Sequence, residues 1–416
     1  MSRILDVFFS NKLVGYLTQK KSGQVTFEYS AQWLNDEHNF AISTSLPLGN
    51  EQFKQKQCRG FFAGILPEEY NRRLIARNLG ISAQNDFAML EKIGGECAGA
   101  LTFLPNGTLP SEQDYEYQPL GDADLIGILK RLSTRPLLAG ESKVRISLAG
   151  AQQKVAIHVD RNGRYSLPLG GAASTHILKP AIAQYPNIVS NETFCLSLAR
   201  SIGIPAVNAT VKSIEHFEFI LVERYDRIFE VAEHFPTRLH QEDFCQALGI
   251  PSERKYQSEG GPGIVDCVEM LKTVSSLPAI DIQNFLNLVV FNLIIGNNDA
   301  HGKNFSLLFR EQGGSMSTRL APAYDVLSTD YYDELTKVMA MKIGKANQFD
   351  RLRARNFERL SKKSGISVAG FRNRICELAE NIRDILSATI REFPVIHDLS
   401  ARIDCRASRL IQAVKR

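Results

Sequence analysis

The chain has 416 residues, of which 44% are apolar and 23% are charged. These proportions exclude a disordered chain, and the length predicts two or three domains because a domain usually holds about 100 to 200 residues. The net charge of +4 is uneven: residues 351–416 carry 15 Lys and Arg against 7 Asp and Glu, so this segment is +8 and the remainder is −4. Such a basic segment could meet nucleic acid, a phosphate or an acidic partner, or could simply form solvated helix faces.

The seven cysteines are scattered and form no C-x-x-C pair. This pattern argues against a disulfide framework and against a zinc site. The first residues are strand-like and lack the apolar core of a signal peptide, and no uninterrupted apolar stretch approaches the roughly 18 residues that span a bilayer. We therefore expect a cytoplasmic protein without membrane contact.

The N-terminal third begins with β-branched and aromatic runs between turn residues. This pattern predicts a small antiparallel meander over residues 4–29. Helices are predicted over Glu68–Arg77, where acidic residues follow Pro67, and over Phe87–Ile93, and a strand over Ala98–Leu104. Turn-rich residues from Pro105 to Pro119 then mark a boundary, so residues 1–110 are assigned to a first domain.

A second segment of interest is Val144–Ile157, which reads as a strand, a turn of small residues and another strand. Backbone N–H groups of such a turn could fold over phosphates. The segment lacks the G-x-x-x-x-G-K-[ST] signature, so a P-loop NTPase is excluded. A hairpin with only a structural role is the alternative.

A lysine, Lys179, ends the apolar strand Thr175–Pro180. The helix that begins near Asn191 carries Glu192 in its first turn, and a Lys–Glu pair of this kind could hold the lysine against ATP phosphates. The alternative is a solvated lysine at a sheet edge. Two further strands follow, over Val207–Val211 and Phe217–Val222, and the second runs into a connector. Residues 111–238 therefore form a β-rich second domain.

From residue 239 the pattern becomes mainly helical, and residues 239–416 are assigned to a third domain. A short helix is predicted over His240–Gly249, a glycine-rich loop over Gly260–Gly263, and a buried helix over Ile282–Ile295, which is apolar around its circumference. Periodic segments at the end predict three more helices: Phe357–Lys363, Val368–Leu386 and Leu399–Val414. Strands first and helices later describe a two-lobed α+β protein with a small N-terminal subdomain and an all-helical C-terminal lobe.

Two metal-competent side chains, Asp299 and Asn304, follow the buried helix in a turn rich in Gly and Asn. In a phosphoryl-transfer site an aspartate orients the attacking hydroxyl and an asparagine five positions later helps to hold magnesium. A hairpin after Asn304 would return Asp325 as a second oxygen ligand, as Mg²⁺ prefers. The spacing D-x-x-x-x-N is common by chance, and a polar loop that caps a helix is the alternative.

Six segments together resemble the HipA-type serine/threonine kinases, which are toxins of bacterial toxin–antitoxin pairs. The resemblance covers essentially the whole chain, including the N-terminal subdomain of the longer HipA proteins. Its segments are Ile146–Lys154, Thr175–Lys179, Val222–Arg227, Gln241–Gln246, Asp299–Ser306 and Tyr324–Asp325.

The resemblance implies a two-lobed kinase-like fold and a set of site residues for ATP and Mg²⁺. Asp299 and Lys179 are the implied catalytic residues, and Asn304 and Asp325 the implied metal ligands. Ser147 corresponds to the regulatory serine that is autophosphorylated, which should inactivate the protein because a phosphate adds about −1.5 to −2 charge to the nucleotide loop. The full set expected around the nucleotide is Ser147, Ala149, Gly150, Ala151, Gln152, Lys154, Lys179, Glu192, Glu223, Tyr225, His301, Lys303, Asn304 and Asp325.

The implied partner is a HipB-type helix-turn-helix antitoxin that binds operator DNA, and the implied protein substrate is a glutamyl-tRNA synthetase. The basic segment over residues 351–416 could contact DNA in the complex with the antitoxin. Two other hypotheses stay open. One is a kinase for a small molecule or lipid, since such kinases also use Asp-x-x-x-x-Asn with a later Asp. The other is a non-catalytic subunit that binds an antitoxin and DNA.

Overall fold

The protein is described by a computed structural model, which places residues 2–229 and 235–415. The chain forms two compact units, and each is assembled from separate stretches of sequence. Unit 1 comprises Met1–Pro180, Ser213–Ser252 and Leu307–Ser317, and unit 2 comprises Ala181–Lys212, Glu253–Ser306 and Thr318–Arg416. The division into domains at residues 110 and 238 stays a prediction.

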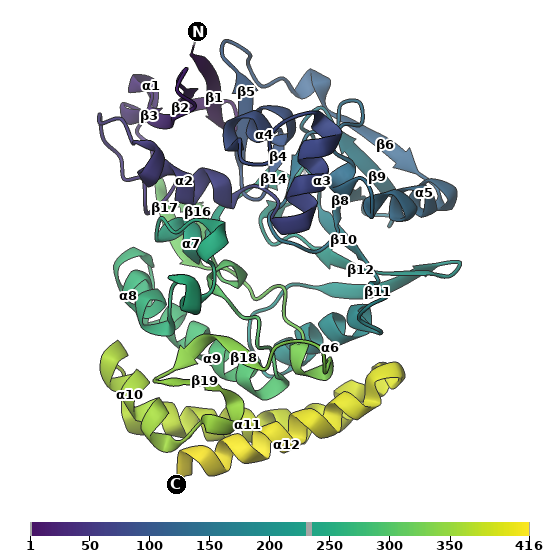
Figure 1. Cartoon of the computed structure of the whole chain (residues 1–416), viewed down its shortest axis with the longest axis vertical. Helices are drawn as coiled ribbons and strands as arrows, with labels where there is room; N and C mark the ends of the chain where they lie inside the picture. Colours follow the sequence, from purple (N-terminus) through teal and green to yellow (C-terminus); the bar gives the residue numbers. More distant parts are fainter. Residues whose placement is uncertain (1, 230–234, 416) are drawn as a thin grey trace. The chain divides into compact units, whose positions relative to one another are not determined.

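Unit 1 begins with the predicted meander, a four-stranded antiparallel sheet in the order β3-β2-β1-β5 (Figure 1). Its core is aromatic, because Trp33 and Phe40 contact Phe9 edge-on beside the sheet. The strands are β1 (Arg3–Phe9), β2 (Lys12–Gln19), β3 (Val25–Tyr29) and β5 (Leu101–Pro105), and the helices beside them are α1 (Ala31–Leu34), α2 (Gln55–Gly64), α3 (Glu69–Leu79) and α4 (Asp86–Ile93).

Unit 1 also contains β12, β10, β8, β9 and β6 of a six-stranded sheet in the order β11-β12-β10-β8-β9-β6, whose edge strand β11 belongs to unit 2 up to Lys212. The edge strand β6 comes from residues that read as turn-rich, and the helix α5 (Asp122–Leu132) lies beside it (Figure 1). The strands are β6 (Glu116–Leu120), β8 (Val155–Val159), β9 (Tyr165–Leu169), β10 (His176–Pro180), β11 (Ala209–Ile214) and β12 (Phe217–Glu223). A separate parallel pair joins β4 (Glu96–Cys97) to β7 (Ile146–Ser147).

The prediction of one helix over His240–Gly249 is wrong in its first half. Residues His240–Asp243 form β15, and only Phe244–Ala247 form the helix α7. His240 and Glu242 are buried, so this stretch follows the period of two of a strand. The helix then starts at Asp243, whose side chain accepts the N–H of Gln246 at 2.9 Å.

Glu242 joins β15 to the segment after the meander. Its carboxylate accepts hydrogen bonds from the hydroxyl of Ser43 at 2.6 Å and from the N–H and hydroxyl of Thr44 at 2.9 and 2.8 Å. The side chain has no solvent exposure, and burial raises the pKa of this carboxyl to about 7 despite the three donors.

We expect the free energy of unfolding to depend on pH through the protonation of Glu242. Because the folded pKa of about 7 lies above the reference value of 4.5, the folded state holds the proton more tightly. The stabilising contribution of the protonated Glu242 carboxyl is therefore full below pH 4.5. As the pH rises from 4.5 to 7, the free energy of unfolding falls by about 3 kcal/mol. Urea unfolding at several pH values should show this slope in the wild type and a flatter one in Glu242→Gln. The exposed Glu215→Gln variant is the control, and an unchanged slope in Glu242→Gln would contradict the assignment.

Unit 2 is mainly helical and is built around the predicted buried helix α9 (Pro278–Ile295). The helices α8, α11 and α12 contact α9, and α11 runs beside α12 (Figure 1). The surrounding helices are α6 (Ile188–Ser201), α8 (Ile264–Val274), α10 (Ala354–Ser364), α11 (Val368–Thr389) and α12 (His397–Lys415). α9 is long and apolar enough to cross a membrane, but 67% of it is buried, as in a core helix.

The α+β class is confirmed by the structure, but the C-terminal lobe is not all-helical. Residues 239–416 also contain strands in a three-stranded sheet and in a hairpin. These strands are β15, β16 (Ser306–Gln312), β17 (Ser315–Leu320), β18 (Val338–Ile343) and β19 (Ala346–Gln348), and a further short pair in unit 1 is β13 (Arg227–Ile228) with β14 (Thr237–Arg238). β16 and β17 turn at two glycines, Gly313 and Gly314, as the sequence predicts.

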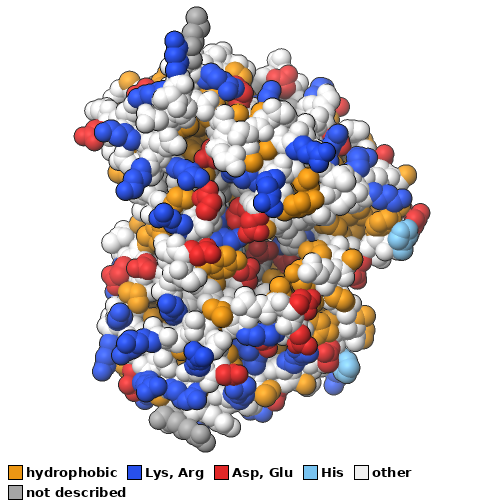
Figure 2. Space-filling model, in the orientation of Figure 1, with side chains coloured by type: hydrophobic (Ala, Val, Ile, Leu, Met, Phe, Trp, Pro, Cys, Tyr) orange, Lys and Arg blue, Asp and Glu red, His pale blue; other side chains and the backbone are white. Residues whose placement is uncertain are grey.

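The basic C-terminal segment lies on the surface of unit 2. Figure 2 shows Lys and Arg side chains gathered in the lower part of the view, where α10 to α12 lie in Figure 1. Some form ion pairs, such as Arg372 with Glu358 and Arg383 with Asp404. Others are exposed, namely Arg351, Arg355, Arg359, Lys362 and Lys363. Solvated helix faces therefore account for part of the charge, and contact with DNA stays a prediction.

Candidate active site

The loop of residues 147–154, which is the predicted nucleotide loop, is held by residues from the first hundred of the chain. Ser147 pairs with Cys97 in the parallel β4–β7 ladder, and its hydroxyl donates to the carbonyl of Ile65 at 3.0 Å. The amide of Asn71 donates to the carbonyl of Ala151 at 2.7 Å, and the N–H of Glu68 donates to Gly150 at 3.3 Å. Ser147 has no solvent exposure, so a reagent reaches its hydroxyl only after the loop leaves this position.

The loop is also closed on itself by a lysine. The amino group of Lys154 donates to the carbonyl of Ala149 at 2.8 Å, and both residues belong to the predicted set. Between them, Ala151 is exposed and Gln152 is partly exposed. The small residues expected to face phosphates thus form a short turn whose two ends are fixed by hydrogen bonds.

Lys179 lies on an interior strand of the six-stranded sheet. β10 pairs with β12 on one side and with β8 on the other, and Lys179 is opposite Ile220 on β12. Its side chain is only 5% exposed. The alternative of a solvated lysine at a sheet edge is therefore wrong, because Lys179 is buried on a strand that has a neighbour on each side.

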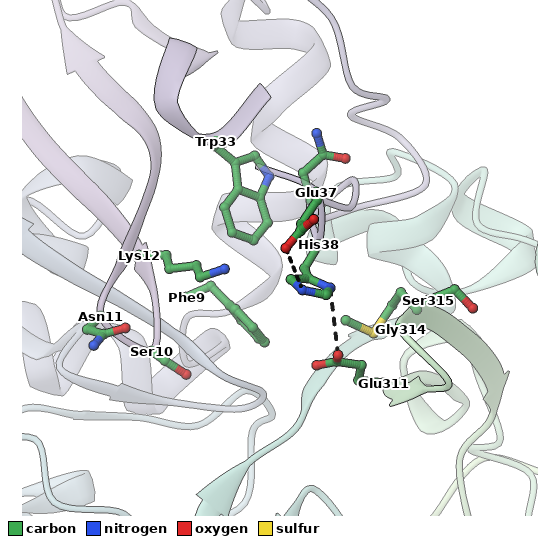
Figure 3. A pocket seen from close by; sticks show the side chains of 12 residues that line it. Phe9, Ser10, Asn11, Lys12, Trp33, Glu37, His38, Glu311, Gly314 and Ser315 are labelled. Atoms are coloured by element: carbon green, nitrogen blue, oxygen red, sulfur yellow. Dashed lines mark ion pairs between the residues drawn. The ribbon is translucent and has the colours of Figure 1, made fainter. Parts of the chain in front are cut away.

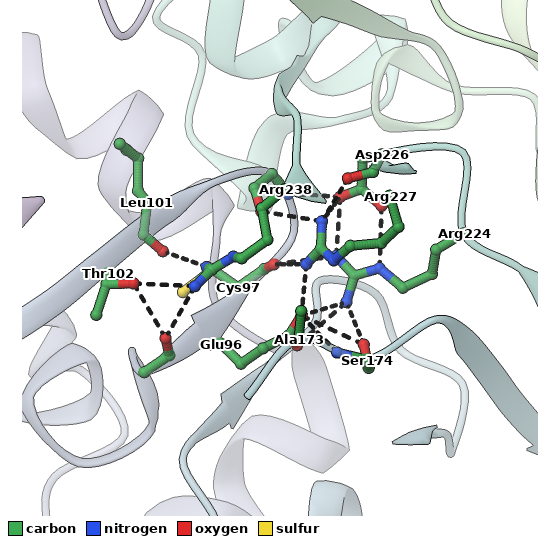
Figure 4. Close-up of polar contacts among 12 residues, drawn as sticks. Glu96, Cys97, Leu101, Thr102, Ala173, Ser174, Arg224, Asp226, Arg227 and Arg238 are labelled. Atoms are coloured by element: carbon green, nitrogen blue, oxygen red, sulfur yellow. Dashed lines mark hydrogen bonds and ion pairs between the residues drawn. The ribbon is translucent and has the colours of Figure 1, made fainter. Parts of the chain in front are cut away.

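The connector after β12 is fixed by a buried network of charges (Figure 4). The guanidinium of Arg224 donates to Glu96 at 3.0 Å and to Asp226 at 2.8 and 3.0 Å. Arg227 forms ion pairs with the same two carboxylates, and all four side chains are at most 3% exposed. Burial opposes ionisation of Glu96, but the two guanidinium groups outweigh it and lower the pKa of the carboxyl.

Two residues that are predicted to contact the nucleotide, Glu223 and Tyr225, are next in sequence to members of this network. Tyr225 lies between Arg224 and Asp226, and its hydroxyl donates to the side chain of Gln241. Glu223 ends β12 opposite His176 and is exposed. Glu96 belongs to β4, the strand that pairs with Ser147. The connector and the nucleotide loop are thus anchored on the same two-residue strand.

In unit 2, the helix α9 delivers Asp299 through a tightly built turn. Gly296 ends the helix with φ +79°, and a Cβ there would lie 2.6 Å from the Cβ of Asp330, so only glycine fits. The N–H of Asp299 donates to the side chain of Asn297 at 3.1 Å, and its carbonyl accepts the N–H of His301 at 2.7 Å. Asp299 is exposed although the residues before it are buried.

The turn before Asp299 is braced by residues that follow Asp325. The hydroxyl of Thr329 accepts the N–H of Asn298 at 2.8 Å and donates to the carbonyl of Gly296 at 3.2 Å. From α12, the guanidinium of Arg406 donates to the carbonyl of Leu293 at 2.9 and 3.0 Å. A cation at this position stabilises the C-terminal end of α9. The two loops that carry Asp299 and Asp325 therefore share one hydrogen-bonded frame.

Asp325 and Glu192 lie on elements that a single asparagine connects. Asp325 has a left-handed backbone with φ +57°, which Asp tolerates better than most residues. Three residues later, the N–H and the carbonyl of Ser328 both bond to the side-chain amide of Asn191 on α6, at 2.8 and 3.0 Å. Glu192 is next to Asn191 and is 2% exposed. Pairing of Glu192 with Lys179 stays a prediction.

The oxygen atoms of Asn304 and Asp325 suit a hard cation. The amide nitrogen of Asn304 donates to the carbonyl of Asp299 at 3.2 Å, which turns its amide oxygen away from the backbone. The predicted ligands are thus chemically a neutral amide oxygen and an anionic carboxylate oxygen, which are donor types that Mg²⁺ prefers. His301 and Lys303, beside Asn304, are both buried. Among residues 2–229 and 235–415, no group of three His, Cys, Asp or Glu side chains is arranged to hold a metal alone.

A cavity of about 290 Å³ in unit 1 lies away from the predicted site residues in the chain, between β1, the residues after α1 and the β16–β17 turn (Figure 3). His38 stands between Glu37 and Glu311, at 3.5 and 3.8 Å, and the aromatic rings of Phe9 and Trp33 form part of the wall. No predicted site residue is among the described side chains that line it. The side chains of His38, Glu37 and Glu311 are well exposed, so contacts between them add little stability.

The predicted site residues divide between the two units. Unit 1 holds the nucleotide loop, Lys179 and the connector, whereas unit 2 holds Glu192 and the two loops of Asp299 and Asp325. Sequence reasoning missed the buried partner Glu96 and the tyrosine Tyr256, whose hydroxyl donates to Asp299 at 2.8 Å. Both are far from their partners in the chain and lie outside any motif, but Arg224, Asp226 and Arg227 directly after an apolar strand were a signal for buried charge.

Comparisons with known proteins match most of the chain. A model described as the HipA N-terminal domain matches residues 5–104, and one described as the HipA-like C-terminal domain matches residues 146–389. Y4mE of Sinorhizobium fredii, named as a kinase, is 44% identical over 97% of this chain and 95% of its own. The serine/threonine-protein kinase toxin HipA of Shewanella oneidensis is 30% identical over 83% of this chain and 79% of its own.

A solved structure shares the fold. The complex of Shewanella oneidensis HipA with HipB and its operator DNA contains a chain that matches with a TM-score of 0.84 and 25% identity. The match covers 99% of this chain and 97% of that one. It supports the α+β, kinase-like class, because the two chains superpose over nearly their whole length.

Proposed function

The chain belongs to the HipA family, and on this premise we propose that it is an ATP-dependent serine/threonine protein kinase that acts as the growth-inhibiting toxin of a toxin–antitoxin pair. The observation that supports this most is the exposed Asp299, held at the exit of a buried helix by the frame that also holds the loop of Asp325. A surface loop braced so firmly around one exposed carboxylate fits a catalytic task better than helix capping.

The proposed roles follow from the chemistry of each side chain. The carboxylate of Asp299 would accept the proton of a serine or threonine hydroxyl while that oxygen attacks the γ-phosphorus of ATP and ADP leaves. The buried ammonium group of Lys179 would hold phosphate oxygens, and the backbone of residues 149–152 would approach them from the nucleotide loop. Glu223 and Tyr225 would contact the adenine end.

Asn304 and Asp325 would hold the magnesium ion, which when bound neutralises charge on the phosphates. His301 and Lys303 are adjacent to these ligands in the chain and complete the proposed nucleotide set. Substitutions of Lys179 and of Asp325 should therefore impair the same phosphoryl transfer.

We propose a HipB-type antitoxin as partner, since the relative from Shewanella oneidensis was solved with HipB and operator DNA. DNA contact would then arise in that complex, with the exposed arginines of α10 as candidates, and the protein would act in the cytoplasm. A glutamyl-tRNA synthetase is proposed as the protein substrate on the resemblance alone. Autophosphorylation at Ser147 would need the loop to open, because the hydroxyl is buried and bonded to Ile65.

The test is phosphopeptide mass spectrometry of a bacterial lysate incubated with ATP, Mg²⁺ and the purified protein. The wild type should add phosphate to serine or threonine of specific proteins, and a peptide with Ser147 should gain phosphate in the protein itself. Lys179→Met should lose both signals, because the phosphates lose their buried cation, while Lys143→Met, an exposed lysine of the same unit, should keep them.

Other outcomes would favour the two alternative functions. ATP consumption without any phosphoprotein would indicate a small-molecule or lipid kinase, whose metabolite product the same lysate would contain. Antitoxin binding without ATP consumption would indicate a non-catalytic regulatory subunit. Either result would overturn the protein-kinase proposal.

A further inference from the structure

Tyr256 belongs to a loop of unit 2 for which the proposed mechanism has no role so far. The loop contains the glycine-rich stretch Gly260–Gly263 and precedes α8. The phenol hydroxyl of Tyr256 donates to Oδ1 of Asp299 at 2.8 Å. Its ring also packs edge-on against His301, with 5.2 Å between ring centroids and 78° between planes. One side chain therefore contacts both ends of the Asp299–His301 turn.

The glycine-rich stretch fixes the backbone of Tyr256. The carbonyl of Tyr256 accepts two N–H groups, from Glu259 and Gly261, each at 2.9 Å. A Cβ on Gly261 would lie 2.3 Å from the carbonyl oxygen of Arg254, so only glycine allows the chain to fold back here. The next residue, Gln257, accepts the N–H of Lys342 on β18 at 2.7 Å. The loop is thus tied at both its turn and its flank.

A cation further restrains the ring. The ammonium group of Lys255 lies 5.5 Å from the centroid of the Tyr256 ring, within the range of a cation–π contact. Lys255 is itself only 7% exposed. The ring is thus held by two contacts, with His301 and with Lys255, and the hydroxyl at its end donates to the exposed carboxylate of Asp299.

We propose that Tyr256 is a positioning residue for phosphoryl transfer, which fixes the carboxylate of Asp299 through the hydrogen bond to Oδ1. The inference rests on the proposed kinase function. A bond on Oδ1 sets the rotation of the carboxylate about χ2, and this aims Oδ2 in one direction. A base of fixed direction meets the acceptor hydroxyl in the geometry that proton transfer needs.

The test compares Tyr256→Phe with the wild type in steady-state transfer of phosphate from ATP to protein. Phenylalanine keeps the ring against His301 and Lys255, so the fold and the melting temperature should be retained. The kcat should fall about tenfold to a hundredfold, as expected for the loss of one hydrogen bond to a charged group. The KM for ATP should stay constant, because the phenol contacts the base and not the nucleotide.

Tyr331→Phe is a matched control, since Tyr331 also donates to an aspartate, Asp398, at 3.1 Å on the surface of the same unit. Its kcat should equal that of the wild type. A second arm uses the Asp299→Asn background, in which Tyr256→Phe should cause no further loss of kcat.

Three results would overturn the inference while the kinase proposal stands. These are an unchanged kcat in an active Tyr256→Phe enzyme, a raised kcat, which would mean that the phenol blocks the acceptor, and phosphate on Tyr256 itself. Absence of phosphoryl transfer by the wild type would instead refute the proposed function, and the inference with it.

Discussion

Asp299→Asn is expected to lower the rate of phosphate transfer by about 10²- to 10⁴-fold, the usual contribution of a general base. Asparagine has the shape of aspartate and still accepts the hydroxyl of Tyr256, but its amide takes no proton from an acceptor hydroxyl. The frame around the turn involves the backbone of residues 296–299 and the side chain of Asn297, so the fold should persist. Transfer of labelled phosphate and binding of a fluorescent ATP analogue measure the two properties separately.

The control for this variant is Asp333→Asn, an aspartate of the same unit whose side chain is 90% exposed. It should transfer phosphate at the wild-type rate. In cells, Asp299→Asn should also relieve growth inhibition. If the variant stayed toxic without transferring phosphate, a non-catalytic regulatory subunit would be the better account.

Glu96→Gln is expected to destabilise the protein by about 3 to 5 kcal/mol, the cost of removing one partner from a buried ion pair. The change leaves Arg224 and Arg227, both at most 2% exposed, with the single carboxylate of Asp226. Trp33 is the one tryptophan of the sequence and lies in unit 1, where it is 2% exposed. Its fluorescence during urea unfolding therefore reports on the unit that contains the network.

The matched control is Glu116→Gln, which breaks an ion pair with Lys143 at 2.9 Å between side chains that are 49% and 62% exposed. Loss of an exposed pair should cost less than about 1 kcal/mol. Equal destabilisation by the two substitutions would contradict the special importance of the buried network. Below the unfolding range, the KM of Glu96→Gln for ATP should rise, because Tyr225 and the loop of Ser147 depend on the strand of Glu96.

Regular periodicity made much of the fold predictable. The meander alternates apolar residues between clear turns, and α9 is apolar on all sides, so local patterns suffice for both. The stretch His240–Gly249 failed because a strand of four residues runs directly into a helix of four, and neither is long enough to show its period. In the C-terminal lobe the same reason applies to β19, which has three residues, but not to β16, β17 and β18, which have six or seven.

The candidate site was predictable where its residues lie close together in the sequence and form a motif, as Asp299 and Asn304 do. It was not predictable where residues meet across long separations. Glu96 is 128 positions from Arg224 and Tyr256 is 43 positions from Asp299, and no local pattern records such contacts. Burial was equally hidden: Lys179 looks like any lysine at the end of a strand until neighbouring strands flank it on both sides.

The interleaving of the two units has a consequence for synthesis on the ribosome. Unit 2 begins at Ala181, but unit 1 receives its last stretch, Leu307–Ser317, much later. Neither unit can therefore finish folding before about three quarters of the chain has left the exit tunnel, whereas domains that follow one another in sequence fold one by one. On the proposed function, the nascent chain would therefore transfer no phosphate until the last stretches of both units have been made.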